Sequence, residues 1–278
     1  MEDWIETGDL RLRYVVDGSG ALDLLVLHTL RTQLEHSDPL VDELAATHRV
    51  HRIDLPGHGR SSKDEGLDYS ANGMAHAVEA TIDHIGAQRI AVVGESIGGA
   101  LAWIAAARRP EQVVAVVSSN PYDSDDGAMI GGTLGRMVTP LAKRSKLIAQ
   151  SDIPPVLRRV LAGGFADPGE LDDDYVKLLA RVASEEEGFG RAQREVLRAS
   201  SSWAAIAEEE YGSVPGDLIA TLVYGEEDWA VVPHRRANAE RLPPITEAEE
   251  MAATGHFAFR ENPAAVLAAI DATLTRLG

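Results

Sequence analysis

One stretch constrains this chain more than any other: residues 89–109, RIAVVGESIGGALAWIAAARR. Residues 89–94 form a short, mostly β-branched apolar run, the pattern of a buried strand. Residues 97–109 are small and apolar and end in two arginines, which is typical of a buried helix finishing in its last turn. A strand that becomes a helix within two residues needs a sharp bend, and this bend falls on Ser96 in the G-x-S-x-G sequence of residues 94–98.

The bend predicts chemistry as well as geometry. Glycine on either side of Ser96 lets the neighbouring backbone come close, because glycine has no Cβ. The turn places the hydroxyl at the carboxyl edge of a sheet, where the free N–H groups of a helix N-terminus face a developing negative charge. The alternative is a tight strand–helix turn that carries a solvated serine.

Composition excludes several classes of protein. The 278 residues include no cysteine, so disulfides, thiolate metal sites and a cysteine nucleophile are excluded. A net charge of −18 argues against nucleic acid and anionic membrane partners. The acidic first residues contain no apolar signal region, and no apolar run reaches membrane-spanning length. We therefore expect a cytoplasmic protein that acts on a small molecule with no cofactor and no metal; its oligomeric state is left open.

The order of elements predicts an α/β fold. Residues 10–16 alternate and residues 17–20 have turn chemistry, which predicts an early hairpin. Helical sequence separates most of the apolar, strand-like runs, which lie at residues 22–28, 48–55, 89–94, 113–118, 217–224 and 246–251. Strands that alternate with helices in this way form a mostly parallel sheet with helices on both faces.

Residues 128–212 break this alternation. They contain no convincing strand, and their helical apolar stripes must be buried against something. Because ligands of open α/β sheets bind at the carboxyl edge of the strands, we expect an inserted helical cap over Ser96. The core is then residues 1–127 and 213–278, and the cap forms the roof of an apolar pocket.

A serine at such a turn needs a base, and an acid and a histidine follow it in this order along the chain. His256 lies in a loop between the last strand and the last helix, at the same edge as Ser96. Asp228 follows the strand at residues 217–224 and would orient His256. The rival acids and base are Glu226, Glu227, Asp123 and His234. The oxyanion would be held by the N–H of Ile97 and by that of Leu30 or Thr29.

With these residues in hand, the chain resembles the α/β-hydrolase fold superfamily over nearly its whole length. The motifs that carry the resemblance are DLPGHGRSS at residues 54–62, VGESIGG at 93–99, YGEED at 224–228, and GHF followed by ENP at 255–257 and 261–263. The resemblance implies an eight-stranded, mostly parallel sheet and a helical cap.

One departure concerns the oxyanion loop. The family usually has His-Gly after the third strand, whereas this chain has His28-Thr29, so the loop must turn with a β-branched residue. Arg31 could enter the site and bind a carboxylate or carbonyl, or could form a structural ion pair. Thr29, Glu95 and Trp229 are further candidates to contact the substrate.

Three hypotheses about function follow. The first is a serine hydrolase that cleaves an ester, thioester or lactone through an acyl-enzyme on Ser96. The second is a lyase, cyclase or cofactor-free oxygenase on the same scaffold, in which His256 is an acid/base. The third is a small-molecule receptor, against which the complete set of Ser96, Asp228 and His256 argues.

Overall fold

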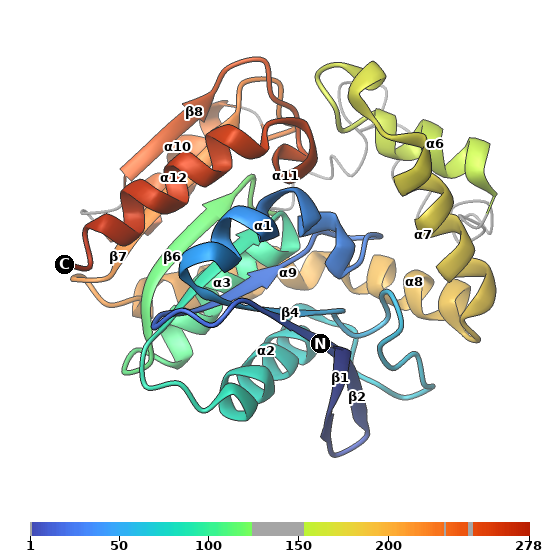
Figure 1. The fold of residues 1–278 in the computed structure, drawn as a ribbon, viewed down its shortest axis with the longest axis horizontal. Helices are drawn as coiled ribbons and strands as arrows, with labels where there is room; N and C mark the ends of the chain where they lie inside the picture. The colour runs from blue at the N-terminus through green and yellow to red at the C-terminus, as the bar shows by residue number, and fades with distance from the viewer. Residues whose placement is uncertain (1, 124–152, 231, 244–246) are drawn as a thin grey trace.

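The computed structural model describes residues 2–123, 153–230, 232–243 and 247–278 (Figure 1). They form one eight-stranded sheet in the order β1-β2-β4-β3-β5-β6-β7-β8, in which β1 and β2 are antiparallel to their neighbours and all other pairs are parallel. The strands are β1 (Glu2–Thr7), β2 (Leu10–Asp17), β3 (Asp23–Leu27), β4 (Arg49–Ile53), β5 (Ile90–Glu95), β6 (Val113–Ser119), β7 (Ile219–Gly225) and β8 (Glu247–Met251). The predicted fold class is confirmed.

Helices cover both faces of the sheet, and each face buries its own apolar core (Figure 1). The helices of the core are α1 (Asp38–Thr47), α2 (Ala71–Ile85), α3 (Ile97–Arg108), α9 (Ser202–Glu210), α10 (Val232–Arg241), α11 (Ala258–Glu261) and α12 (Pro263–Thr275). Helices α2, α3 and α9 pack together on one face, whereas α1 and α12 pack on the other. Strands β3, β5 and β6 are apolar almost throughout because they are buried on both sides.

The early hairpin is present, but not where the sequence analysis placed it. The turn falls at Gly8 and Asp9, between β1 and β2, and Gly8 has a left-handed φ of 55°. Residues 18–20 instead lead from β2 to β3, which are not neighbours in the sheet. A turn signal identifies a reversal of the chain, but it does not tell which strands pair across it.

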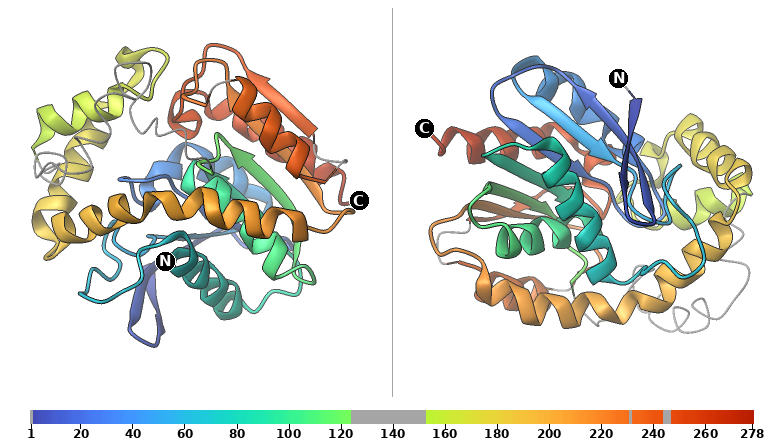
Figure 2. Two further views of the ribbon diagram at one scale, coloured as in Figure 1. Left: turned by 180° about the vertical axis from the view of Figure 1, so that it is seen from behind. Right: turned by 90° about the horizontal axis from the view of Figure 1, so that it is seen from below.

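The described helices of the predicted cap fall into two groups: α6 (Pro154–Ala162) with α7 (Asp173–Glu185), and α8 (Phe189–Arg198) with α9. Residues 128–152 lie outside the described residues. Helices α6 and α7 form an apolar cluster of their own, which Phe257 of the core completes. Helix α8 leads to α9, which packs on α3 (Figure 2). The predicted range 128–212 therefore includes α9, a helix that packs on the core, because helical sequence does not reveal which neighbour buries it.

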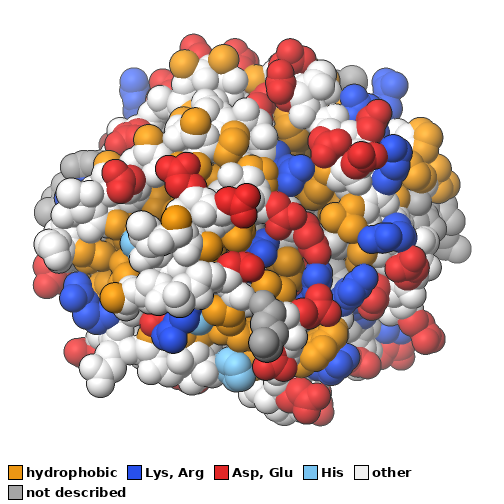
Figure 3. All heavy atoms as spheres, in the orientation of Figure 1, with side chains coloured by type: hydrophobic (Ala, Val, Ile, Leu, Met, Phe, Trp, Pro, Cys, Tyr) orange, Lys and Arg blue, Asp and Glu red, His pale blue; other side chains and the backbone are white. Residues whose placement is uncertain are grey.

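The surface agrees with a strongly acidic chain in which the charges are dispersed. On the face drawn in Figure 3, basic side chains lie interspersed among the more numerous acidic ones. None of the helices in the described residues has both the length and the apolar character needed to span a membrane.

Candidate active site

Ser96 sits at the sharp turn that the sequence predicts between β5 and α3. Its backbone is left-handed, with φ 58° and ψ −117°, a conformation that is strained for a residue with a Cβ. Both flanking glycines are needed for the turn. A Cβ on Gly94 would lie 2.0 Å from the carbonyl oxygen of Gly98, and one on Gly98 would lie 2.5 Å from that of Leu27. The backbone N–H of Ser96 donates to Ser119 at the end of β6 (2.9 Å).

The three predicted catalytic side chains form one hydrogen-bonded chain. Ser96 Oγ lies 2.9 Å from His256 Nε2, and His256 Nδ1 lies 2.6 Å from Asp228 Oδ1. All three side chains are buried: Ser96 and His256 are 2% and 4% exposed, and the side chain of Asp228 is 1% exposed. Burial alone would raise the pKa of Asp228, but His256 and the N–H of Ala230 (3.1 Å) outweigh burial and lower it. Asp228 is therefore an ionised acceptor that fixes the His256 tautomer with Nε2 facing Ser96.

The rival acids make other contacts. Asp123 is buried and accepts hydrogen bonds from Tyr211 Oη (2.9 Å) and Asn238 Nδ2 (2.6 Å). Glu226 and Glu227 are exposed at the surface. The structure thus brings Asp228, and none of these three, against the imidazole. The side chain of the rival base His234 lies outside the described residues.

The loop that carries His256 is held by its backbone. Asn120 Nδ2 donates to the carbonyl oxygens of Gly255 (3.1 Å) and His256 (3.0 Å), while Asn120 Oδ1 accepts from the N–H of Gly225 (2.8 Å). One amide therefore joins the ends of β6 and β7 to the histidine loop. Asn120 was not among the residues expected from the sequence, although its place directly after a buried strand, at the edge where Ser96, Asp228 and His256 meet, is a usable signal.

Residues of the predicted cap also contact this loop. The N–H of His256 donates to the carbonyl oxygen of Gly164 (2.6 Å), and Trp229 Nε1 donates to that of Gly163 (2.9 Å). The indole of Trp229 also stacks on the imidazole of His256. Trp229, expected as a substrate contact, thus packs on the base and ties it to the cap.

The oxyanion loop turns, but at a residue other than the expected one. The left-handed residue is Arg31, with φ 64°, and the carbonyl oxygen of Thr29 accepts from Thr32 Oγ1 (2.8 Å). His28 Nε2 accepts from the N–H of Leu55 (2.9 Å), so its Nδ1–H donates to the carbonyl oxygen of Thr29 (2.8 Å). Burial lowers the pKa of His28 to about 4, so it is a neutral structural residue and not a second base.

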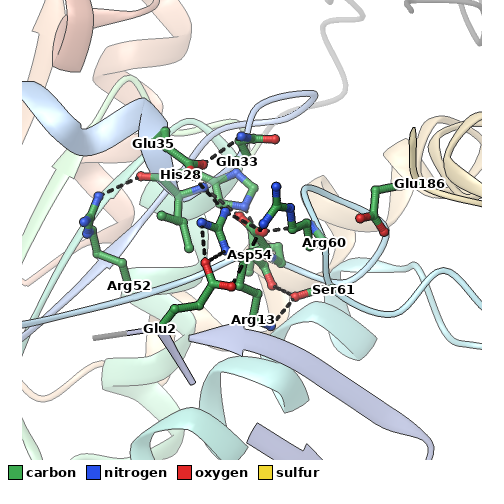
Figure 4. A network of polar contacts seen from close by, with 12 residues as sticks. Glu2, Arg13, His28, Gln33, Glu35, Arg52, Asp54, Arg60, Ser61 and Glu186 are labelled. Atoms are coloured by element: carbon green, nitrogen blue, oxygen red, sulfur yellow. Dashed lines mark hydrogen bonds and ion pairs between the residues drawn. The ribbon is translucent and has the colours of Figure 1, made fainter. Parts of the chain in front are cut away.

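The DLPGHGRSS motif holds the chain that directly follows the oxyanion loop. Figure 4 shows that Asp54, directly after β4, lies at the centre of this network. Asp54 Oδ1 accepts from the N–H of Leu34 (2.7 Å), and Oδ2 accepts from that of Arg60 (2.8 Å). Gly59 has a left-handed φ of 46°, and a Cβ there would lie 2.0 Å from Asp54 Oδ2. The motif therefore fixes the chain that follows the oxyanion loop.

The other expected site residues are placed as follows. Ile97 opens α3 directly after Ser96, so its N–H belongs to a first helical turn that lacks intrahelical acceptors. Leu30 is half-buried between Thr29 and Arg31. Arg31 is buried, which lowers its pKa to about 10, and its charge reaches His58. Glu95 is fully buried, and both oxygens of its carboxyl group bond to protein groups, so it is not a substrate contact.

The chain is similar in sequence to several bacterial proteins. The component named dihydrolipoyllysine-residue acetyltransferase of the acetoin cleaving system of Cupriavidus necator is 28% identical over 91% of this chain; the chain spans 63% of that relative's length. The pimeloyl-[acyl-carrier protein] methyl ester esterase of Edwardsiella ictaluri is 36% identical, over 37% of this chain and 39% of its own length.

A solved structure shows the same architecture. The epoxide hydrolase CorEH superposes with a TM-score of 0.80, at 18% identity, over 100% of this chain and 99% of its own. The family model described as the alpha/beta hydrolase fold matches residues 24–263. This match includes the turn at Ser96, Asp228 and His256. The chain belongs to the α/β-hydrolase fold family.

Proposed function

We propose that this protein is a serine hydrolase that cleaves an ester, thioester or lactone of a small, largely apolar molecule. The observation that carries the proposal is the buried hydrogen-bonded chain from Ser96 through His256 to Asp228, which starts at a strained turn. A nucleophile, a base within hydrogen-bond reach and an acid that orients the base are the elements of nucleophilic acyl transfer. A named esterase among the relatives supports an ester substrate.

The reaction would proceed in two halves. Ser96 Oγ attacks the carbonyl carbon and passes its proton to His256 Nε2, while the N–H groups of Ile97 and Leu30 hold the oxyanion. The imidazolium gives that proton to the leaving alkoxide or thiolate, which leaves an acyl group on Ser96. His256 then takes a proton from water, and the hydroxide attacks the acyl carbonyl. The resulting tetrahedral intermediate expels Ser96 Oγ, which recovers that proton from His256 Nε2, and the acid departs. Asp228 stays ionised throughout and stabilises the imidazolium.

The cap supports a largely apolar substrate. Its helices α6 and α7 share an apolar cluster with Phe257 and with Trp229, which stacks on His256. The acidic residues of the cap, Asp172–Asp174 and Glu185–Glu187, lie mostly at the surface, where they would repel polyanions.

A fluorophosphonate probe tests the nucleophile directly. We expect one label, on Ser96, that is lost in Ser96→Ala and strongly reduced in His256→Ala. A folded wild-type protein that stays unlabelled, while a control serine hydrolase reacts, contradicts the proposal. A protein whose Ser96→Ala variant keeps full turnover of its substrate, and whose His256→Ala variant does not, is instead a non-hydrolytic enzyme that uses His256 as acid/base.

A further inference from the structure

The side chain that precedes the nucleophile lies at a junction of buried polar groups. Glu95 Oε1 accepts from the N–H of Phe259 (2.8 Å), and Glu95 Oε2 lies 2.5 Å from His36 Nε2. The other ring nitrogen, His36 Nδ1, lies 2.7 Å from Tyr175 Oη. Glu95, His36 and Tyr175 are 0%, 1% and 5% exposed. We refer to these three side chains as the Glu95–His36–Tyr175 link.

The link joins the parts of the chain on which acyl transfer would depend. Glu95 ends β5 and adjoins Ser96, whereas Phe259 follows His256 by three residues. His36 lies in η1 (Leu34–Ser37), a short 3-10 helix that follows the oxyanion loop. Tyr175 belongs to cap helix α7. One carboxyl group therefore connects the nucleophile turn, the base loop and the oxyanion loop, and His36 extends the connection to the cap.

Burial favours the uncharged forms of the link. It raises the pKa of Glu95 to about 8 and lowers the pKa of His36 well below its ordinary value. A protonated Glu95 donates to His36 Nε2, which leaves His36 Nδ1–H to donate to Tyr175, so the hydrogen bonds point in one consistent direction. The charged or titratable groups that face the pair are His256, Asp228, Arg260, Glu261 and Asp38.

We propose that Glu95, His36 and Tyr175 are positioning residues that hold the nucleophile turn, the oxyanion loop and the base loop in register beneath the cap. The inference rests on the proposed function. The link touches no reacting atom; it acts through Ser96 and His256. Catalytic groups must be held within a fraction of an ångström of their working geometry, and a buried hydrogen-bonded support of this kind supplies that precision.

The molecule contains a matched control for the link. Tyr14 Oη lies 2.5 Å from His51 Nδ1, and His51 Nε2 lies 2.7 Å from Asp23 Oδ1. The order of groups, phenol to imidazole to carboxyl, is the same, and all three side chains are buried. Asp23 pairs with Ile90 at the start of β5, so this control lies one strand length away from Ser96, roughly 20 Å.

The kinetic test uses conservative variants with p-nitrophenyl acetate. We expect Glu95→Ala to lower kcat about 10- to 100-fold with little change in KM, and Glu95→Gln to recover most of that loss. The glutamine amide can accept from Phe259 and donate to His36. Tyr175→Phe should lower kcat about 3- to 10-fold, whereas Tyr14→Phe should keep kcat while losing similar thermal stability. Equal losses of kcat in the two tyrosine variants, or an unchanged kcat in Glu95→Ala, would overturn the inference.

Hydrogen exchange separates this inference from the proposed function, because it needs no activity. In Glu95→Gln and Glu95→Ala, exchange should quicken at residues 34–37 and 257–261, more strongly in the alanine variant. In Tyr175→Phe it should quicken at residues 34–37 and 173–185. Tyr14→Phe should leave all three segments unchanged. If the wild type does not react with a fluorophosphonate, the proposed function fails, but these exchange rates still test the link. Unchanged rates in Glu95→Gln, Glu95→Ala and Tyr175→Phe refute it.

Discussion

The indole of Trp229 lies flat against the imidazole of His256, with ring centroids 4.0 Å apart and planes 13° from parallel. The electron-rich face of an indole attracts a cation, so this contact stabilises His256 more when the ring is charged, as it would be during proton transfer. Under the proposed mechanism, the contact should therefore speed the chemical step.

Replacing Trp229 with Leu should lower kcat about 3- to 30-fold, which corresponds to the ~0.5–2 kcal/mol of a cation–π contact. The kcat of Trp229→Phe should lie between those of the wild type and Trp229→Leu, because phenylalanine keeps a smaller aromatic face. The measurement is kcat with p-nitrophenyl acetate, together with the rate of fluorophosphonate labelling. A leucine variant as fast as wild type would show that the stack only fills space.

Replacing Asp228 with Asn should lower the rate by about three to four orders of magnitude, because the amide favours the wrong His256 tautomer. Asp123→Asn is the matched control, since Asp123 is also a buried carboxyl group but bonds Tyr211 and Asn238. It should lower stability and leave kcat nearly unchanged. The reverse result would place the catalytic acid after β6.

The stability of the protein should fall in mild acid. Burial lowers the pKa of His28 to about 4, whereas an unfolded histidine titrates near 6.5. Below pH 6.5 the unfolded chain binds a proton that the folded chain does not, so stability present above pH 6.5 is lost progressively down to about pH 4. The loss from His28 is about 3 kcal/mol. The pKa values of buried His36 and His58 are lowered in the same direction and add to it.

Urea unfolding at pH 7, 5.5 and 4.5 measures this effect. The His28→Gln variant is the comparison, because its amide oxygen can still accept from the N–H of Leu55 but does not titrate. Its midpoint should decline less steeply than that of the wild type. Parallel declines would mean that His28 is protonated in the folded state.

The hydrolase activity that we propose should fall at alkaline pH. Burial raises the pKa of Glu95 to about 8, so the link loses its proton as the pH rises through that value. The new negative charge beside Ser96 should oppose the oxyanion and lower kcat roughly tenfold. A kcat profile from pH 6 to 10 should show this decline in wild type and not in Glu95→Gln. The prediction fails if both proteins decline alike.

The features that were best predicted from the sequence are those that the order and direction of the strands determine. Parallel strands bring their carboxyl ends to one edge, so Ser96, Asp228 and His256 could be assembled from three separate motifs before any contact was known. The sequence could not tell which neighbour a side chain faces. Glu95 and Trp229 adjoin catalytic residues and were expected in the pocket, but Glu95 bonds His36 and Trp229 stacks on His256.

Two other features could not be predicted, because tertiary contacts determine them as well: the turn of the oxyanion loop and the packing of α9. The oxyanion loop lacks the usual glycine, and only the three-dimensional path of the chain shows that Arg31 takes the left-handed turn. Helix α9 lies within the residues predicted as the cap, but it packs on α3. Local pattern predicts that a face is buried, whereas the tertiary fold decides what buries it.

The two hydrogen bonds between the end of α6 and the catalytic loops are accepted by main-chain carbonyls, those of Gly163 and Gly164. A main-chain carbonyl is present whatever residue stands at a position. A Cβ on Gly164 would lie 2.4 Å from the Phe257 ring, so that position is restricted, but the side chains of α6 and α7 take no part in these two bonds. Under the proposed function, substitutions in α6 and α7 should therefore change which substrates are accepted while His256 keeps its place, so selectivity can change without a change in the reaction.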